Sequence, residues 1–174
     1  MEKSYIKNRK GQKIAVVVEK VSPQKGLAFV MHGLGGYKEQ PHVQTFAKSF
    51  RDNGMTTVMF DTTNTLGESD GNYEDATITN YYEDLADIIQ WASSQDLYQE
   101  PFYLAGHSLG GISTALYAEK YPNKIKGLAP ISTVVSGKLS ERSPANKDLL
   151  EDWKKTGILV KQSYSKPGTV KKLK

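Results

Sequence analysis

The chain has 174 residues, of which 38% are hydrophobic and 24% charged, and this composition matches one soluble globular domain with a sizeable core. Its formal net charge of +4 comes in part from a basic tail, where five of the last fourteen residues are lysines, and no aromatic-interleaved basic stripe points to a nucleic-acid partner. The absence of cysteine excludes a disulfide framework and a thiolate metal site, and it fits a reducing compartment.

The N-terminal region predicts a β-hairpin. Two β-like stretches, residues 4–7 and 13–21, flank the turn signal of residues 8–11. Residues 1–13 are charged and contain no apolar segment of the kind found in signal peptides. The longest apolar runs, residues 14–18 and 27–31, are far too short to span a bilayer. We therefore expect a cytoplasmic protein with no membrane span.

The following segments alternate between strands and helices. Residues 27–31 form a continuous apolar run bounded by glycine, which is typical of a strand buried on both faces. The same reasoning predicts three more core strands, at residues 56–60, 102–105 and 125–131. Helices are predicted between them, at residues 41–52, 78–94 and 109–121. This alternation predicts an α/β protein with a mostly parallel sheet flanked by helices.

The sequence Gly106-His107-Ser108-Leu109-Gly110 lies between a predicted strand and a predicted helix. The pattern G-x-S-x-G is a weak signal by itself, because many matches are ordinary loop turns. In this context it predicts a nucleophile elbow, a strained turn that lifts the Ser108 hydroxyl clear of the sheet. Glycine is needed on both sides because a Cβ there would collide with the neighbouring strand or helix. Ser108 is therefore the candidate nucleophile.

A second glycine-rich stretch, residues 32–36, follows the first buried strand. It can be interpreted as a flexible surface turn. Because an elbow lies downstream, we favour the alternative that this loop forms half of an oxyanion hole, with the backbone amide of Leu34 as the donor.

Three motifs together resemble the α/β-hydrolase superfamily. Within it they most resemble the monoacylglycerol-lipase-like and serine-aminopeptidase-like branch, which includes bacterial cinnamoyl and feruloyl esterases. The resemblance covers residues 27 to about 132, and its motifs are the elbow with Gly111, residues 32–36, and the loop of residues 61–71 that contains Gly67-Glu68-Ser69-Asp70-Gly71.

This resemblance implies an α/β-hydrolase fold and a small-molecule ester substrate, without a cofactor or a metal ion. Ser108 would attack a carbonyl carbon, and the amides of Leu34 and Leu109 would bind the resulting oxyanion. A histidine would accept the serine proton and an acidic residue would orient that histidine. In the family these partners follow later core strands, in the order serine, acid, histidine.

The histidines of this chain depart from that pattern, because none follows the elbow. The three are His32, His42 and His107. His107 diverges from Ser108 in an elbow, and His32 lies where the family has a structural histidine. We interpret His42 as a surface or substrate-contact residue at the rim of the site, with a role as the base as the less favoured alternative. The acid and the base are therefore not identified in this chain.

The C-terminal region does not have the pattern of further core strands. A helix is predicted from Ser143-Pro144 through Trp153, closed by Gly157, and residues 158–165 form a short, partly alternating stretch. This region resembles the start of the cap that the family inserts after the sixth strand. Asp148 and Asp152 fall on the cap helix, away from the position of a triad acid. We therefore divide the chain into residues 1–132, an N-terminal hydrolase core without the last core strands, and residues 133–174, a partial cap.

Three functions remain open from the sequence. The first is a truncated serine hydrolase acting on carboxylic esters, with the acid and the histidine missing. The others are a non-catalytic binding or interaction protein on a hydrolase scaffold, and one piece of a two-chain hydrolase. The strand ending near Ile131 would have an unpaired edge, through which the protein could self-associate. Short or aromatic esters fit the polar loop of residues 62–73 as well as monoglycerides do.

Overall fold

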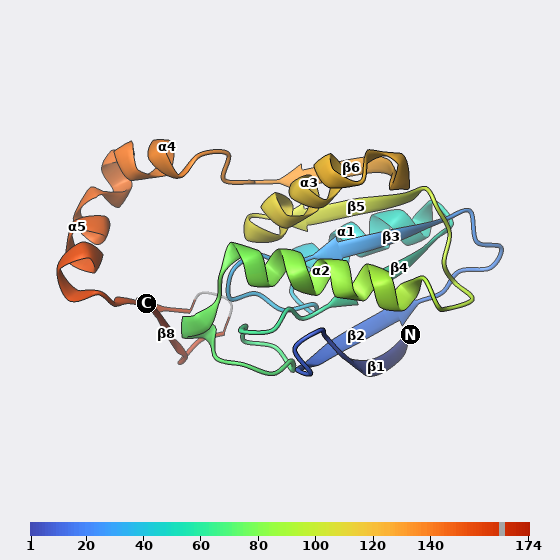
Figure 1. The fold of residues 1–174 in the computed structure, drawn as a ribbon, viewed down its shortest axis with the longest axis horizontal. Helices are drawn as coiled ribbons and strands as arrows, with labels where there is room; N and C mark the ends of the chain where they lie inside the picture. The colour runs from blue at the N-terminus through green and yellow to red at the C-terminus, as the bar shows by residue number, and fades with distance from the viewer. Residues whose placement is uncertain (164–165) are drawn as a thin grey trace.

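A computed structural model describes residues 1–163 and 166–174, and a six-stranded sheet dominates it (Figure 1). The spatial order of the strands is β1-β2-β4-β3-β5-β6. Their bounds are Glu2–Lys7 for β1, Lys13–Glu19 for β2, Gly26–Met31 for β3, Met55–Phe60 for β4, Phe102–His107 for β5 and Ile125–Ile131 for β6.

The sheet is mixed but mostly parallel. Strands β1 and β2 form the predicted N-terminal hairpin, and β2 also pairs antiparallel with β4. The pairs β4–β3, β3–β5 and β5–β6 are parallel. Parallel neighbours need crossover connections, and the helices predicted between these strands provide them. Both the fold class and the N-terminal hairpin expected from the sequence are confirmed.

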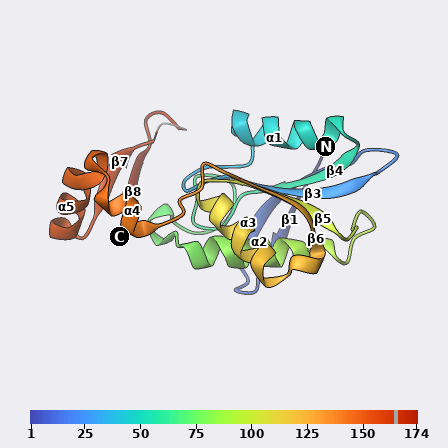
Figure 2. The ribbon, with the colours of Figure 1, turned by 90° about the horizontal axis from the view of Figure 1, so that it is seen from above.

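Helices cover both faces of the sheet (Figure 2). Helix α1 (Pro41–Asp52) lies on one face, and α2 (Ile78–Ala92) and α3 (Leu109–Lys120) lie on the other. Successive side chains of a strand point to opposite faces, so Phe29 packs in the core beneath α2 and α3 whereas Val30 packs beneath α1. This two-sided burial explains the continuous apolar run of β3, where every residue is buried.

The helix bounds follow the sequence signals closely. Helix α1 begins at Pro41 and ends at Asp52, as predicted, and Gly54 after it has a φ of +81°. Helix α2 begins after Thr77, whose side chain accepts a hydrogen bond from the backbone N–H of Asn80, and it ends at Ala92, two residues before the predicted end. None of the helices in residues 1–163 and 166–174 is long and apolar enough to cross a membrane.

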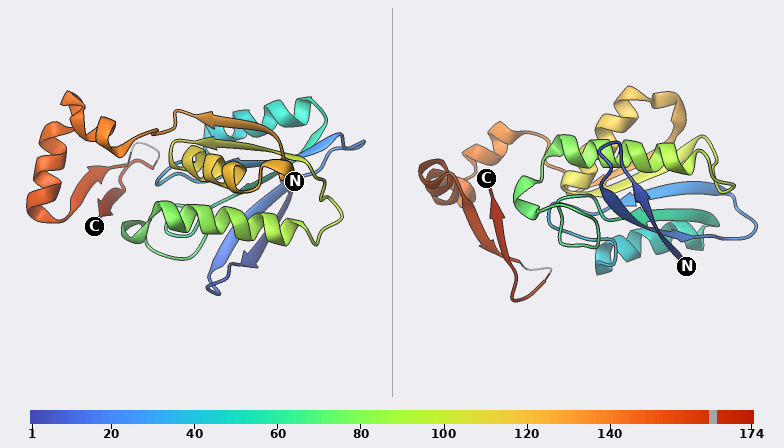
Figure 3. Two further views of the ribbon diagram at one scale, coloured as in Figure 1. Left: turned by 45° about the horizontal axis from the view of Figure 1, so that its top comes forward. Right: turned by 60° about the horizontal axis from the view of Figure 1, so that its bottom comes forward.

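The C-terminal segment lies beyond the carboxyl ends of the parallel strands, and the N-terminal hairpin forms a margin of the sheet (Figures 1 and 3). The predicted helix forms as α5 (Lys147–Thr156), which begins later than predicted because residues 144–146 form a 3-10 turn, and Gly157 closes it with a φ of +72°. Two elements that the sequence did not predict are the short helix α4 (Gly137–Arg142) and the strand β8 (Val170–Leu173). Strand β7 (Leu159–Gln162) pairs antiparallel with β8, and residues 164–165 of the predicted stretch lie outside the described residues.

The described residues also contain three short 3-10 helices: η1 (Tyr73–Asp75), η2 (Pro122–Lys124) and η3 (Pro144–Asn146). The strand β8 packs against η1, which ends the polar loop of residues 62–73. The hairpin β7–β8 is thereby placed next to the ends of the core strands, where the candidate site lies.

Candidate active site

Ser108 occupies a strained turn between β5 and α3. Its φ is +52° and its ψ is −114°, angles that residues with a side chain rarely adopt. The backbone N–H of Ser108 donates to the carbonyl oxygen of Ile131 at 2.8 Å, so the turn is anchored to the end of β6. This is the strand-turn-helix geometry expected of a nucleophile elbow.

The two glycines of the elbow are required by close backbone packing. A Cβ on Gly106 would collide with the backbone of Gly110 and lie 2.7 Å from the amide nitrogen of Gly111, at the start of α3. A Cβ on Gly110 would collide with the carbonyl oxygen of His32 and lie 2.8 Å from the Cβ of Met31. The missing Cβ of Gly106 lets α3 pack against β5, and the missing Cβ of Gly110 lets α3 pack against the end of β3. The sequence predicted such close packing at both glycines.

The glycine-rich loop of residues 32–36 packs directly against the elbow. A Cβ on Gly33 would lie 3.1 Å from the Cβ of Ser108 and 3.0 Å from Nδ1 of His107. The hydroxyl of Tyr81, buried on α2, donates to the carbonyl oxygen of Gly33 and accepts the N–H of Gly35, both at 3.3 Å. The core of the protein therefore positions this loop beside Ser108.

His32 is a buried structural residue, in agreement with its interpretation from the sequence. Its Nε2 accepts the backbone N–H of Thr62 at 3.1 Å. The proton must then reside on Nδ1, which donates to the carbonyl oxygen of Gly33 at 2.8 Å. Burial lowers the pKa of His32 and so favours the neutral ring that the bond from Thr62 requires. Because both nitrogens are engaged, His32 cannot act as a base for Ser108.

Ser108 opens into a cavity of about 300 Å³ at the carboxyl ends of the parallel strands. The residues that line it come from the loop, the start of α1, the elbow and strand β8: residues 33–36, Gln40, His42, His107, Ser108 and Lys171. Ser108 and Leu34, two of the residues selected from the sequence, therefore share one cavity. Leu109, the third, is the first residue of α3 and packs partly against the core.

His42 and His107 line this cavity as a contacting pair. Their ring centroids are 4.7 Å apart, and His42 also meets Phe46 at 5.9 Å. His42 belongs to α1, within the helix predicted for residues 41–52, and its side chain is partly buried. Burial, followed by the charge of His107, lowers the pKa of His42.

Neither His42 nor His107 is hydrogen-bonded to Ser108, the candidate nucleophile. Nε2 of His42 is buried and has no hydrogen-bond partner, and none of the side chains that the structure describes is hydrogen-bonded to the hydroxyl of Ser108. The serine thus has no partner there that could accept its proton.

A buried lysine, which sequence reasoning missed, lies behind the loop. The ammonium of Lys38 contacts Asp61 at 2.8 Å, Glu68 at 2.6 Å and Glu39 at 2.9 Å, and its side chain is fully buried. Burial alone would lower the pKa of Lys38, but its hydrogen bonds to these carboxylates raise it. The exposed carboxylate of Glu68 accepts hydrogen bonds from Lys3 and from Lys38. These bonds, the one from Lys3 first, lower the pKa of Glu68 to about 2.

Asp61 completes this cluster and links it to the backbone. Its carboxylate accepts the N–H of Lys38 at 2.7 Å and the N–H of Glu68 at 2.8 Å. A Cβ on Gly67 would collide with the same carboxylate, which explains the glycine at this position of the loop motif. The cluster thus joins the loop of residues 61–71 to the segment that leads from the glycine-rich loop into α1. No group of three metal-ligating side chains exists among the residues described.

Comparison with known proteins places these features in a family. The model of the family described as serine aminopeptidase, S33, matches residues 22–166. Palmitoyl-protein thioesterase ABHD10, mitochondrial, from Bos taurus is 32% identical over 99 residues, which are 57% of this chain and 29% of that protein.

Solved structures show the same fold. Est1E from Butyrivibrio proteoclasticus, with ferulic acid bound, superposes with a TM-score of 0.69 at 28% identity, over 75% of this chain and 52% of Est1E. Mouse α/β-hydrolase domain-containing protein 10 has a TM-score of 0.68 at 21% identity, over 91% of this chain and 60% of that one. The chain thus spans about half of Est1E and less than a third of the bovine thioesterase. With its mixed sheet, flanking helices and family match, the chain belongs to the serine aminopeptidase S33 family of α/β-hydrolases.

Proposed function

We propose that this protein is a serine hydrolase of carboxylic esters, in which Ser108 is the nucleophile and the amides of Leu34 and Leu109 form the oxyanion hole. One observation carries the proposal. Ser108 is held at a φ of +52° between β5 and α3, and it opens into the same cavity as Leu34. A non-glycine residue in such a conformation has a cost of about 1–3 kcal/mol, which proteins retain mainly at functional sites.

The proposed reaction is acyl transfer through a covalent intermediate. The Ser108 oxygen would form a bond to the ester carbonyl carbon while its proton passes to a base, giving a tetrahedral oxyanion. Collapse of the oxyanion would expel the alcohol, protonated by the same base, and leave an acyl-serine that water hydrolyses. Backbone amides aimed at the oxyanion would stabilise it, and the loss of one such donor typically reduces the rate by about 10²–10³.

The base and the acid, in this proposal, come from polypeptide outside these 174 residues, either the same chain or a second one. Two observations support this. No histidine follows His107 in the sequence, and in the described part of the chain the Ser108 hydroxyl has no imidazole partner. The family match covers residues 22–166, whereas Est1E is about twice as long as the region it shares with this chain.

The proposed substrate class is a compact carboxylic ester. Est1E was solved with ferulic acid, a small aromatic carboxylic acid, and the bovine relative is named as a thioesterase. The cavity beside Ser108 measures about 300 Å³, at the lower end of the usual range of ligand sites, so a short acyl group fits it best.

Hydrolysis of p-nitrophenyl acetate tests the proposal. The chain would be extended through the reading frame that follows residue 174, and Ser108→Ala would be compared with Ser132→Ala. Ser132 is a matched control because it also follows a parallel strand and has a φ of +49°. We expect Ser108→Ala to abolish turnover with a stability change within about 1 kcal/mol, and Ser132→Ala to retain it. Equal turnover by Ser108→Ala and the parent would refute the nucleophile and favour a binding protein on this scaffold.

A further inference from the structure

The hairpin β7–β8 brings two lysines together. Its register places Lys161 of β7 directly opposite Lys171 of β8. Side chains in such positions are about 4.5–5.5 Å apart at Cβ, and like charges facing each other in this way are destabilising. No ion pair of either lysine is present among the described residues. The carboxylates of the adjacent turn η1, Glu74 and Asp75, contact Lys174, at 3.0 and 4.0 Å.

Lys171 reaches from this hairpin into the Ser108 cavity. Its Nζ lies 2.8 Å from the position that a Cβ on Gly35 would occupy, and 5.5 Å from the centre of the Tyr73 ring. Gly35 has a φ of +64° and carries no side chain, so the loop leaves room for the ammonium. Lys171 is half-buried, and this burial lowers its pKa because the charged group has lost part of its hydration.

The cavities on both sides of Lys171 lack acidic side chains among the residues described. The Ser108 cavity contains no aspartate or glutamate. A second cavity of about 210 Å³, between the hairpin and Tyr73, is lined by both lysines and also has no carboxylate. Half-buried Lys171 and exposed Lys161 therefore border a space that no acidic side chain lines among the residues described.

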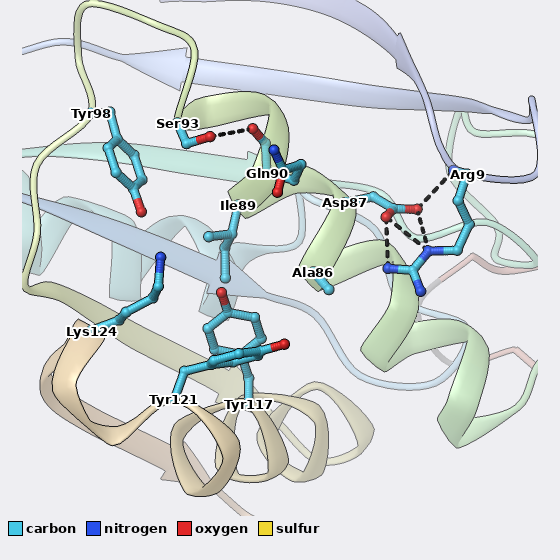
Figure 4. A pocket seen from close by; sticks show the side chains of 10 residues that line it. All are labelled: Arg9, Ala86, Asp87, Ile89, Gln90, Ser93, Tyr98, Tyr117, Tyr121 and Lys124. Atoms are coloured by element: carbon cyan, nitrogen blue, oxygen red, sulfur yellow. Dashed lines mark hydrogen bonds and ion pairs between the residues drawn. The ribbon is translucent and has the colours of Figure 1, made fainter.

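Another cavity of this protein shows the opposite arrangement. It lies between α2 and α3, has a volume of about 260 Å³ and contains the cations Arg9 and Lys124 (Figure 4). Arg9 is paired with Asp87 at 2.8 Å, and Lys124 with Glu100 at 2.7 Å. Because these charges are compensated by the protein itself, they indicate no ligand.

We propose that Lys171, assisted by Lys161, is an anion-binding subsite that selects esters carrying a free carboxylate, such as the half-esters of dicarboxylic acids. The ester group would lie beside Ser108 and the carboxylate against the hairpin lysines. The bound carboxylate would neutralise the two opposed lysines. It would also replace water at the ammonium of Lys171 and accept a charge-assisted hydrogen bond from it. This substrate preference rests on the proposed hydrolase function.

Binding measured in a Ser108→Ala background tests the subsite without turnover of the ester. Amide chemical shifts would be titrated with monomethyl glutarate and with dimethyl glutarate, which differ in one charge. We expect the half-ester to bind about tenfold more tightly, the size of one charge-assisted hydrogen bond. Adding Lys171→Gln should remove this preference, whereas Lys171→Arg should retain it. Lys161→Gln should reduce the preference in part.

Lys172→Gln is the matched control, because Lys172 is exposed on the same strand and faces Val160 across the hairpin. It removes the same net charge and should leave the preference intact. Equal binding of the two esters by the parent, or an equal loss in Lys172→Gln and Lys171→Gln, would overturn the subsite. Loss of the half-ester preference in Lys171→Arg would also overturn the subsite, since Lys171 would then act as an amine and not through its positive charge.

Labelling with a fluorophosphonate, compared with the binding preference, tests the hydrolase function separately from the subsite. A fluorophosphonate reacts with an activated serine whether or not the substrate carries a carboxylate. Labelling of Ser108 without a half-ester preference would leave the function standing and refute the subsite. A half-ester preference without labelling in the extended protein would retain the subsite and refute the function.

Discussion

At the scale of single residues, the candidate site depends on glycines that have no Cβ as much as on the side chains that line it. Gly106 and Gly110 let α3 start so close to β5 and β3 that Ser108 must project into the cavity. These glycines and Ser108 could be predicted from the sequence because the whole constraint lies within five consecutive residues. Lys38 could not, because a lysine surrounded by polar residues suggests a surface position. Its partners Asp61 and Glu68 lie 23 and 30 residues away.

Gly110→Ala tests the packing of the elbow. The new Cβ would meet the carbonyl oxygen of His32, a backbone atom that cannot move without displacing β3. We expect a loss of about 1–3 kcal/mol in the free energy of unfolding, measured with urea, the usual cost of overpacking. Gly137→Ala is the control, since a Cβ on Gly137 has no neighbour within 4 Å and should change stability by less than about 0.5 kcal/mol. Equal stability of the two variants would show that the elbow tolerates a side chain at residue 110.

At the scale of elements, buried polar groups join segments that are distant in sequence. The carboxylate of Asp84 on α2 accepts hydrogen bonds from Asn8 at 3.0 Å, from Asn80 at 2.9 Å, and from the backbone and hydroxyl of Thr63 at 2.6 and 2.8 Å. Burial raises the pKa of Asp84, although hydrogen bonds from Asn8 and Thr63 oppose the shift. One side chain thus ties the turn of the N-terminal hairpin and the loop after β4 to a helix.

We expect Asp84→Ala to lower the free energy of unfolding by about 2–4 kcal/mol, because it leaves several buried donors without an acceptor. Asp52→Ala is the matched control. Asp52 pairs with Lys48 on the exposed side of α1, and such pairs contribute about 0–1 kcal/mol. Thermal and urea unfolding of both variants would check this. Losses of similar size would mean that the Asp84 contacts contribute no more than a surface ion pair.

The elements differed in how well the sequence predicted them. Helix α1 and strand β3 matched their predicted bounds within one residue, because apolar periodicity, Pro41 and flanking glycines all agreed. Helix α4 and strand β8 were missed. The first has six residues and the second four, too few to show a period, and β8 forms through pairing with β7. Pairing of this kind is a tertiary property that local patterns do not encode.

At the scale of the whole molecule, the described sheet ends at β6, whose residues alternate between exposed and half-buried. An unpaired edge strand offers free backbone donors and acceptors to another chain. Lys126 and Pro130 lie on this strand and weaken such pairing in part. We expect the 174-residue chain to self-associate through β6, with an apparent mass that rises with concentration in sedimentation velocity experiments.

Leu128→Lys tests this expectation by placing a charge on the edge strand, and it should shift the chain toward the monomer. Leu116→Lys on α3 is the matched control, since both leucines are 40% exposed and the substitution is the same. The control should leave self-association unchanged. A monomeric parent at all concentrations, or equal effects of the two variants, would show that β6 is not the contact.

The central proposal is that Ser108 is an activatable nucleophile whose proton acceptor lies outside these 174 residues. The most direct measurement is the rate of covalent modification by a fluorophosphonate, with the adduct located by mass spectrometry. We expect slow labelling of the 174-residue chain, because loss of a triad member typically costs on the order of 10⁴–10⁶ in turnover. Extension through the following reading frame should give rapid labelling at Ser108 alone, abolished by Ser108→Ala. Rapid labelling of the unextended chain, or an adduct at another serine in the extended protein, would contradict the claim.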